Sequence, residues 1–166
     1  DWGYVDIGPL VPWLGRLMRV LFGESLLALR LPSAIAGAAT VYLTAWLARY
    51  LGGGRTAQLL AGLSVIIAPI WLQAGNILSL PSFESLFWMA CICLIAVIIK
   101  TGNRRLWLAV GVIAGIGLLN KPSMVFFAIG LVVGLVVTKQ RKFFADKWLW
   151  IGGAIALLIA TPNIVW

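Results

Sequence analysis

The chain is a series of apolar segments separated by short polar connections. A helix needs roughly 20 apolar residues to cross about 30 Å of hydrocarbon. Six segments of the sequence come close to that length: residues 31–50, 57–74, 82–99, 106–120, 122–138 and 148–166. The pattern predicts an all-α integral membrane protein in which about six spans form a helical bundle.

The fourth and fifth segments belong to one apolar stretch, 106–138, which is interrupted only at its centre. As a single helix it would be about 50 Å long at 1.5 Å per residue, too long for one crossing. Lys121-Pro122 stands at the centre, and proline disfavours the helical conformation in the residue before it. We predict two spans joined by a tight turn at Lys121, with a re-entrant or broken segment as the alternative.

The first thirty residues carry too many charges to form a span. Apolar side chains recur every three or four residues in 12–22, which predicts an amphipathic helix in the membrane interface. Arg16 and Arg19 lie away from that apolar stripe, and we expect them to extend to water at headgroup level. The pattern of polar and apolar residues in 23–30 predicts a second short amphipathic turn that leads into the first span.

Pairs of small residues at a spacing of four predict close contacts between helices. Gly111 with Gly115 and Gly130 with Gly134 follow this spacing. Glycines so placed lie on one face of a helix and let a neighbouring backbone approach. The spacing indicates a packed bundle.

Composition supports a membrane protein and excludes other classes. Hydrophobic residues make up 62% of the chain and charged residues 11%, against about 45–50% and about a quarter in soluble domains. The apolar content excludes disorder. The net charge is +8, but the chain has no basic run long enough to follow a phosphate backbone, so we expect no nucleic acid partner.

The chain has no histidine, which excludes His-based zinc sites and Ser-His-Asp triads within it. We expect no metal and no cofactor, and we expect Cys91 and Cys93 to be packing residues.

The charges also predict an orientation, because cytoplasmic loops carry an excess of Lys and Arg. With the predicted spans, nine cations and one acid fall on one face, and four cations and four acids on the other. The basic face holds Arg49, Arg55, Lys100, Arg104, Arg105, Lys139, Arg141, Lys142 and Lys147, with Asp146 as its acid. We therefore divide the chain into an outer loop with interfacial helices, 1–30, and a transmembrane bundle, 31–166.

Four ionisable residues on the predicted outer face are candidate functional residues: Asp6, Arg30, Glu84 and Lys121. Ionisable groups at membrane depth are costly, and function is their default interpretation. Lys121 is the strongest candidate, since it is the only charge in 106–138. Lysine and arginine suit a phosphate, and a carboxylate can act as a general base toward an acceptor. A lipid-linked phosphosugar would use both kinds of group.

Two other functions stay open from the residues alone. A transporter or flippase also places few charges among many spans, but near the midplane and beside broken helices. Here the outer charges are concentrated at the rim, which argues against transport. A non-catalytic membrane scaffold is the third interpretation.

Short motifs along the whole chain resemble those of glycosyltransferase family 39-like membrane proteins. These are relatives of dolichyl-phosphate-mannose–protein mannosyltransferases and of lipid A aminoarabinose transferases. Residues 1–12 are similar to the first outer loop of the family. The other matches are Phe22-Gly-Glu-Ser25, Arg30-Leu-Pro32, Leu51-Gly-Gly-Gly-Arg55, Ser85-Leu-Phe-Trp88, Lys100-Thr-Gly-Asn103, Leu106-Trp-Leu108, Gly115-Ile-Gly-Leu-Leu-Asn-Lys121, Thr161-Pro-Asn163 and Trp166.

The resemblance implies a GT-C-type multi-span bundle with its active site in a large outer loop. It implies a mannosyltransferase-like hexosyl or pentosyl transferase of the bacterial inner membrane, in which the outer loop 1–30 would be periplasmic. Such an enzyme transfers a sugar, with inversion and with little or no metal dependence, from a polyprenyl-phosphate donor. The donor lipid would be undecaprenyl or dolichyl phosphate, and the acceptor a protein, a lipid or a glycan.

The resemblance also implies roles for individual residues. Carried over by position, Asp6 belongs to the catalytic loop, which continues as Ile7-Gly8-Pro9 where the family commonly has His-Pro-Pro. Arg30 and Lys121 would steady the loop or contact the lipid phosphate, and Glu84 would lie at the cavity rim. The main catalytic Asp-Glu pair of the family would fall upstream of the first residue. We therefore expect the chain to be the N-terminal membrane part of a longer protein and to be inactive alone.

Overall fold

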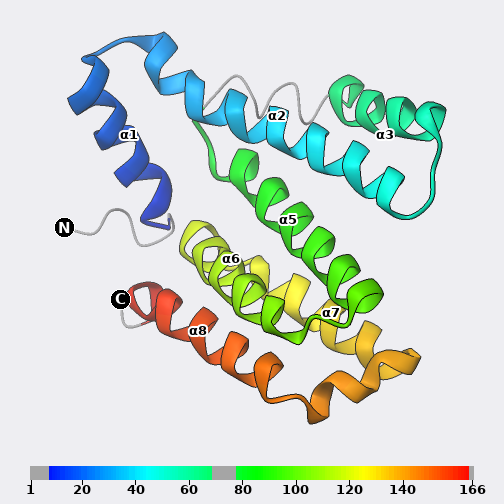
Figure 1. Ribbon diagram of the computed structural model, residues 1–166. Helices are drawn as coiled ribbons and strands as arrows, with labels where there is room; N and C mark the ends of the chain where they lie inside the picture. The colour runs from blue at the N-terminus through cyan, green and yellow to red at the C-terminus, as the bar shows by residue number, and fades with distance from the viewer. Residues whose placement is uncertain (1–7, 69–77, 165–166) are drawn as a thin grey trace. The chain divides into compact units, whose positions relative to one another are not determined.

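The computed structural model describes residues 8–68 and 78–164, and all regular structure in them is helical. The helices are α1 (Leu10–Phe22), α2 (Leu26–Tyr50), α3 (Arg55–Ile67), α5 (Leu80–Thr101), α6 (Trp107–Asn120), α7 (Met124–Val137) and α8 (Lys147–Ile164) (Figure 1). Two 3₁₀ segments, η1 (Arg104–Leu106) and η2 (Lys139–Ala145), precede α6 and α8. The predicted all-α architecture is confirmed for the described residues.

Each of the six predicted apolar segments contains a helix, but the helices differ in length from the predicted spans. α2 and α5 are long and apolar enough to cross a membrane alone. α7 and η2 pass the same test only together, with a bend of 113° between them, and α3 and α6 are shorter apolar helices. By length and composition, the described residues hold two membrane-crossing helices, or three if the bent pair counts as one span.

The start of α2 differs from the prediction. The helix begins at Leu26, so 26–30 form its first turn instead of a separate turn before the span. Leucine and alanine are strong helix formers, and the helix extends back through them to its N-cap, Ser25. Pro32 consequently lies inside the helix, where it lacks the amide that would donate to the preceding turn.

The described residues form two compact units. The first is Leu10–Met89, in which α2 and α3 pack side by side (Figure 1). The short loop between these two helices contains Gly52, whose φ of +103° lies in the left-handed region that favours glycine after a helix end. The second unit combines Asp1–Pro9 with Ala90–Trp166 and contains α6, α7 and α8.

In the second unit, the backbones of α6 and α8 are in direct contact. A Cβ added to Gly111 would lie 2.2 Å from the Gly152 carbonyl oxygen, and one on Gly152 would lie 2.3 Å from that of Trp107. Further along both helices, a Cβ on Gly115 would lie 2.8 Å from the Cβ of Ile159. Because the contacts advance in the same direction on both helices, α6 and α8 run parallel. Small residues permit this approach, and packing holds helices together in a membrane, where the hydrophobic effect does not.

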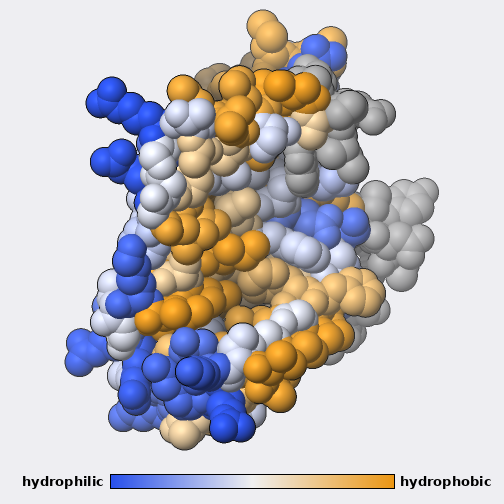
Figure 2. All heavy atoms as spheres, turned by 90° about the vertical axis from the view of Figure 1, so that its right-hand side faces the viewer, coloured by the Kyte–Doolittle hydropathy of each residue, from blue (hydrophilic) through white to orange (hydrophobic). Residues whose placement is uncertain are grey.

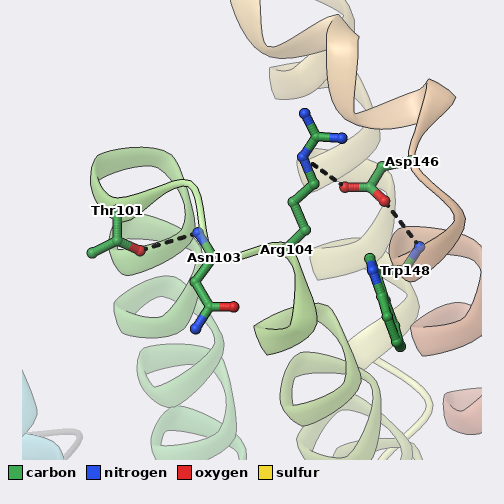
Figure 3. A network of polar contacts seen from close by, with 5 residues as sticks. All are labelled: Thr101, Asn103, Arg104, Asp146 and Trp148. Carbon is green, nitrogen blue, oxygen red and sulfur yellow. Dashed lines mark hydrogen bonds and ion pairs between the residues drawn. The ribbon is translucent and has the colours of Figure 1, made fainter.

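Asp146 connects the start of α6 to the start of α8 (Figure 3). Its Oδ1 accepts a hydrogen bond of 3.2 Å from the backbone amide of Trp148, so it caps α8. Its Oδ2 lies 3.3 Å from Arg104 Nε in an ion pair. The Asp146 side chain is 5% exposed and that of Arg104 is 62% exposed, so water screens the ion pair and the cap carries most of the stabilisation.

We expect Asp146→Ala to lower the free energy of unfolding by about 1 kcal/mol, the usual contribution of an N-cap. Asp146→Asn keeps a capping oxygen and removes the charge, so it should cost less. SDS titration of the protein in mixed micelles measures both. If asparagine destabilises as much as alanine, the ion pair and not the cap is the main contribution.

Candidate functional site

The turn between α6 and α7 is the best-defined candidate site in the second unit. α6 ends at Asn120 and α7 begins at Met124, so the predicted break at Lys121 is confirmed. Lys121 has extended backbone angles, φ −157° and ψ 134°, as expected for a residue before proline. Its side chain is half-buried, beside the fully buried Asn120. The sequence therefore places a lysine at a helix end, partly within the fold.

Gly8, which precedes the first helix, packs directly on this turn. A Cβ added to Gly8 would lie 2.2 Å from the carbonyl oxygen of Leu119 and 2.4 Å from that of Asn120. Gly8 and Pro9 are both buried. Only glycine fits at position 8, because any side chain would overlap backbone atoms of α6.

The end of α8 contacts the same turn. The Asn163 side chain donates a hydrogen bond of 3.0 Å from Nδ2 to the Leu118 carbonyl oxygen. The last carbonyl groups of a helix have no partner within it, and here Asn163 supplies one. Gly8 and Asn163 are the site residues that sequence reasoning missed. Both stand in motifs of the family resemblance, but a motif does not tell which distant segments meet.

The electrostatics of the turn favour a cation. The carbonyl groups at the end of α6 carry the negative end of the helix dipole, which stabilises a lysine placed there. The first amides of α7 are already engaged: Met124 N donates to the Lys121 carbonyl oxygen at 3.2 Å, and Val125 N to that of Pro122 at 2.9 Å. An anion at this turn would therefore bind the Lys121 ammonium and not these amides.

The other candidate residues lie elsewhere in the chain. Arg30 is exposed on α2 and Glu84 is half-buried near the start of α5, and both belong to the first unit. Lys121 belongs to the second unit. Asp6 lies outside the described residues. In the described part of the chain, no three His, Cys, Asp or Glu side chains are close enough to hold a metal ion.

Within the second unit, the basic residues lie at the opposite end of α6 from Lys121. Arg104 and Arg105 precede this helix of 14 residues, and Lys121 follows it. At 1.5 Å per residue the two ends are about 20 Å apart. Exposed lysines and arginines of η2 add to the basic end. η2 is the segment between α7 and α8 in Figure 1, and Figure 2 shows hydrophilic side chains gathered at the same height, near the bottom of the view. This separation is the one that the charge pattern predicts for these loops.

Comparison with known proteins identifies relatives of this chain. The family model described as dolichyl-phosphate-mannose-protein mannosyltransferase matches residues 6–166. The chain is similar to an undecaprenyl phosphate-alpha-4-amino-4-deoxy-L-arabinose arabinosyl transferase of Erwinia tasmaniensis, with 26% identity over 155 residues. That match covers 89% of this chain and 27% of the relative, so the chain spans about a quarter of the relative's length. No solved structure matches the chain.

Proposed function

Because the chain belongs to the dolichyl-phosphate-mannose-protein mannosyltransferase family, we propose that it is the membrane part of a polyprenyl-phosphate-dependent glycosyltransferase. The enzyme would move a hexosyl or pentosyl group from a lipid-linked donor to a protein, lipid or glycan acceptor at the outer face of the membrane. The family match over 6–166 carries this proposal. The name of the Erwinia tasmaniensis relative specifies undecaprenyl phosphate, which favours that lipid over dolichyl phosphate as the donor.

The α6–α7 turn supports a site for the phosphate of the donor. Lys121 is a half-buried cation at a helix end, and an ammonium group binds a phosphate as a point charge. In this proposal Lys121 binds the donor phosphate, and its charge compensates the negative charge that remains on the phosphate when the sugar leaves.

The contact of Gly8 with this turn supports a catalytic role for Asp6, which stands two residues earlier in the sequence. Two residues of extended chain span at most about 7 Å, and Gly8 packs on the α6–α7 turn. The carboxylate would act as a general base toward the acceptor, or would position the loop for a stronger acid elsewhere in the protein. Arg30 would assist at the phosphate and Glu84 at the rim of the cavity.

The topology is part of the same proposal. Six helices at the predicted places, in a GT-C-type arrangement of the bacterial inner membrane, would put 1–30 and Lys121 outside. The separation of charge along α6 supports this orientation for the second unit.

Lys121→Ala tests the proposal directly. In membranes that contain the intact protein, we expect the variant to bind labelled undecaprenyl-phosphate sugar at least about tenfold more weakly, the usual effect of losing a hydrogen bond to a charged group. Sugar transfer should fall at least as much. Lys121→Arg keeps the charge and should retain part of both.

The matched control is Lys139→Ala, which removes an exposed lysine of η2 and should change neither quantity. Unchanged donor binding in Lys121→Ala would remove the role given to Lys121. If the intact, full-length protein transferred no sugar from an undecaprenyl or a dolichyl donor, the transferase proposal would fail and the transporter or scaffold interpretation would replace it.

A further inference from the structure

A groove of about 710 Å³ lies between α1 and the start of α2, in the first unit. Its lining includes Pro12, Gly15, Arg16 and Arg19 of α1, together with Glu24 and Leu29. The four α1 positions follow a spacing of three and four, so they lie on one face of that helix. The groove has the volume of a small-molecule site, and it contains none of the four candidate residues of the transferase proposal.

The groove carries one net positive charge. The Arg19 guanidinium forms an ion pair with the Glu24 carboxylate, which fixes one side of the groove. Arg16 is exposed and has no ion-pair partner within the described residues. Two guanidinium groups and one carboxylate complement a single phosphodiester, which carries one negative charge. Guanidinium groups also match the geometry of phosphate oxygens.

Two apolar side chains line the groove, Val20 of α1 and Leu29 of α2, and Val20 is 75% exposed. Further apolar side chains are exposed outside the groove. Trp13, Leu17 and Leu21 are exposed on the other face of α1. Leu26 and Leu27, at the start of α2, are 71% and 79% exposed. α2 is one of the two described helices long and apolar enough to cross a membrane alone. The groove adjoins the start of that helix, where a spanning helix would pass from the headgroups into the hydrocarbon. Arginine in such a place holds its charge near water and its stem along apolar surface.

We propose that this groove binds an anionic glycerophospholipid of the surrounding bilayer. Its phosphodiester contacts Arg16 and Arg19, and its acyl chains lie along Val20 and along the exposed leucines at the start of α2. The predicted interfacial helix thereby becomes a lipid-binding element, and Arg16 and Arg19 bind a ligand instead of only extending to water. The proposal goes beyond the transferase reaction and does not depend on it.

Native mass spectrometry of the intact protein in micelles tests this. The protein is given equal amounts of phosphatidylglycerol and phosphatidylcholine, and the retained lipid is identified. We expect phosphatidylglycerol to be retained in preference, and Arg16→Gln to reduce that retention about tenfold. Arg16→Lys should retain an intermediate amount, because it keeps the charge and loses the fork geometry. Arg49→Gln, at an exposed position in the last turn of α2, is the control and should change nothing.

Three results would overturn the proposal. The first is equal retention of phosphatidylglycerol by the protein and by Arg16→Gln. The second is retention of phosphatidylcholine as strong as that of phosphatidylglycerol, since the net charge of the groove would then not select the lipid. The third is displacement of phosphatidylglycerol from the protein, but not from Arg16→Gln, by an undecaprenyl-phosphate sugar, which would assign the groove to the donor. No sugar transfer is measured, so failure here is separate from failure of the transferase proposal.

Discussion

Gly111→Ala is expected to lower the free energy of unfolding by about 3 kcal/mol, the upper part of the usual range for overpacking. The new Cβ would lie 2.2 Å from the Gly152 carbonyl oxygen and 2.7 Å from the Cα of the same residue. These are backbone atoms that cannot rotate aside, so α6 and α8 have to move apart. The movement would also separate Gly115 from Ala156 one turn further along. SDS titration in mixed micelles measures the loss.

Gly153→Ala is the matched control, on α8 and next to the contact residue. A Cβ at Gly153 meets nothing within 4 Å, and alanine favours helix over glycine by up to about 1 kcal/mol. Its stability should be unchanged or slightly raised. The double variant Gly111→Ala with Gly152→Ala should cost less than the two single losses together, because the first substitution already separates the helices. Equal stability of Gly111→Ala and Gly153→Ala would contradict the contact.

The glycine pairs show how much helix packing the sequence predicts. Both pairs have the same spacing, but only Gly111 and Gly115 contact a neighbouring helix. Around Gly130 and Gly134, which α7 carries, a Cβ would meet open space. Spacing places small residues on one face of a helix, whereas the neighbour on that face depends on segments far away in the sequence. Helix positions could thus be predicted from local pattern, and helix partners could not.

In the candidate site too, local features could be predicted from the sequence and contacts between distant segments could not. The helix break at Lys121 is a local feature, because proline restricts the residue before it, and its prediction is confirmed. The role given to Lys121 stays a prediction. The contacts of Gly8 and Asn163 with the end of α6 join residues more than forty positions apart, and no periodicity encodes them. Asp146 was predicted only as one acid among basic residues; its role as a cap depends on where α8 begins.

The second large effect is expected for Gly8→Ala, on sugar transfer and not on folding. The new Cβ would overlap the carbonyl oxygens of Leu119 and Asn120. The N-terminal loop would have to move by roughly 1 Å, and a displacement of that size can reduce catalysis about 100-fold. Unlike Gly111→Ala, this change displaces the end of a loop and leaves the contact of α6 with α8 in place. We therefore expect transfer by the intact protein to fall about 100-fold, with a nearly unchanged SDS unfolding midpoint.

Gly37→Ala is the control for a glycine-to-alanine change in an open place, because a Cβ there meets nothing within 4 Å. It should leave transfer as it is, with stability unchanged or slightly raised. Gly8→Ser should lose at least as much transfer as Gly8→Ala, since its side chain adds an atom to the same overlap.

Donor binding separates two causes of a loss of transfer. If Gly8→Ala binds donor normally and transfers poorly, the loop positions the attacking group. If binding and transfer fall together, the loop shapes the phosphate site at Lys121. Normal transfer by Gly8→Ala would show that the position of this loop does not matter to the reaction, and the role proposed for Asp6 would fall with it.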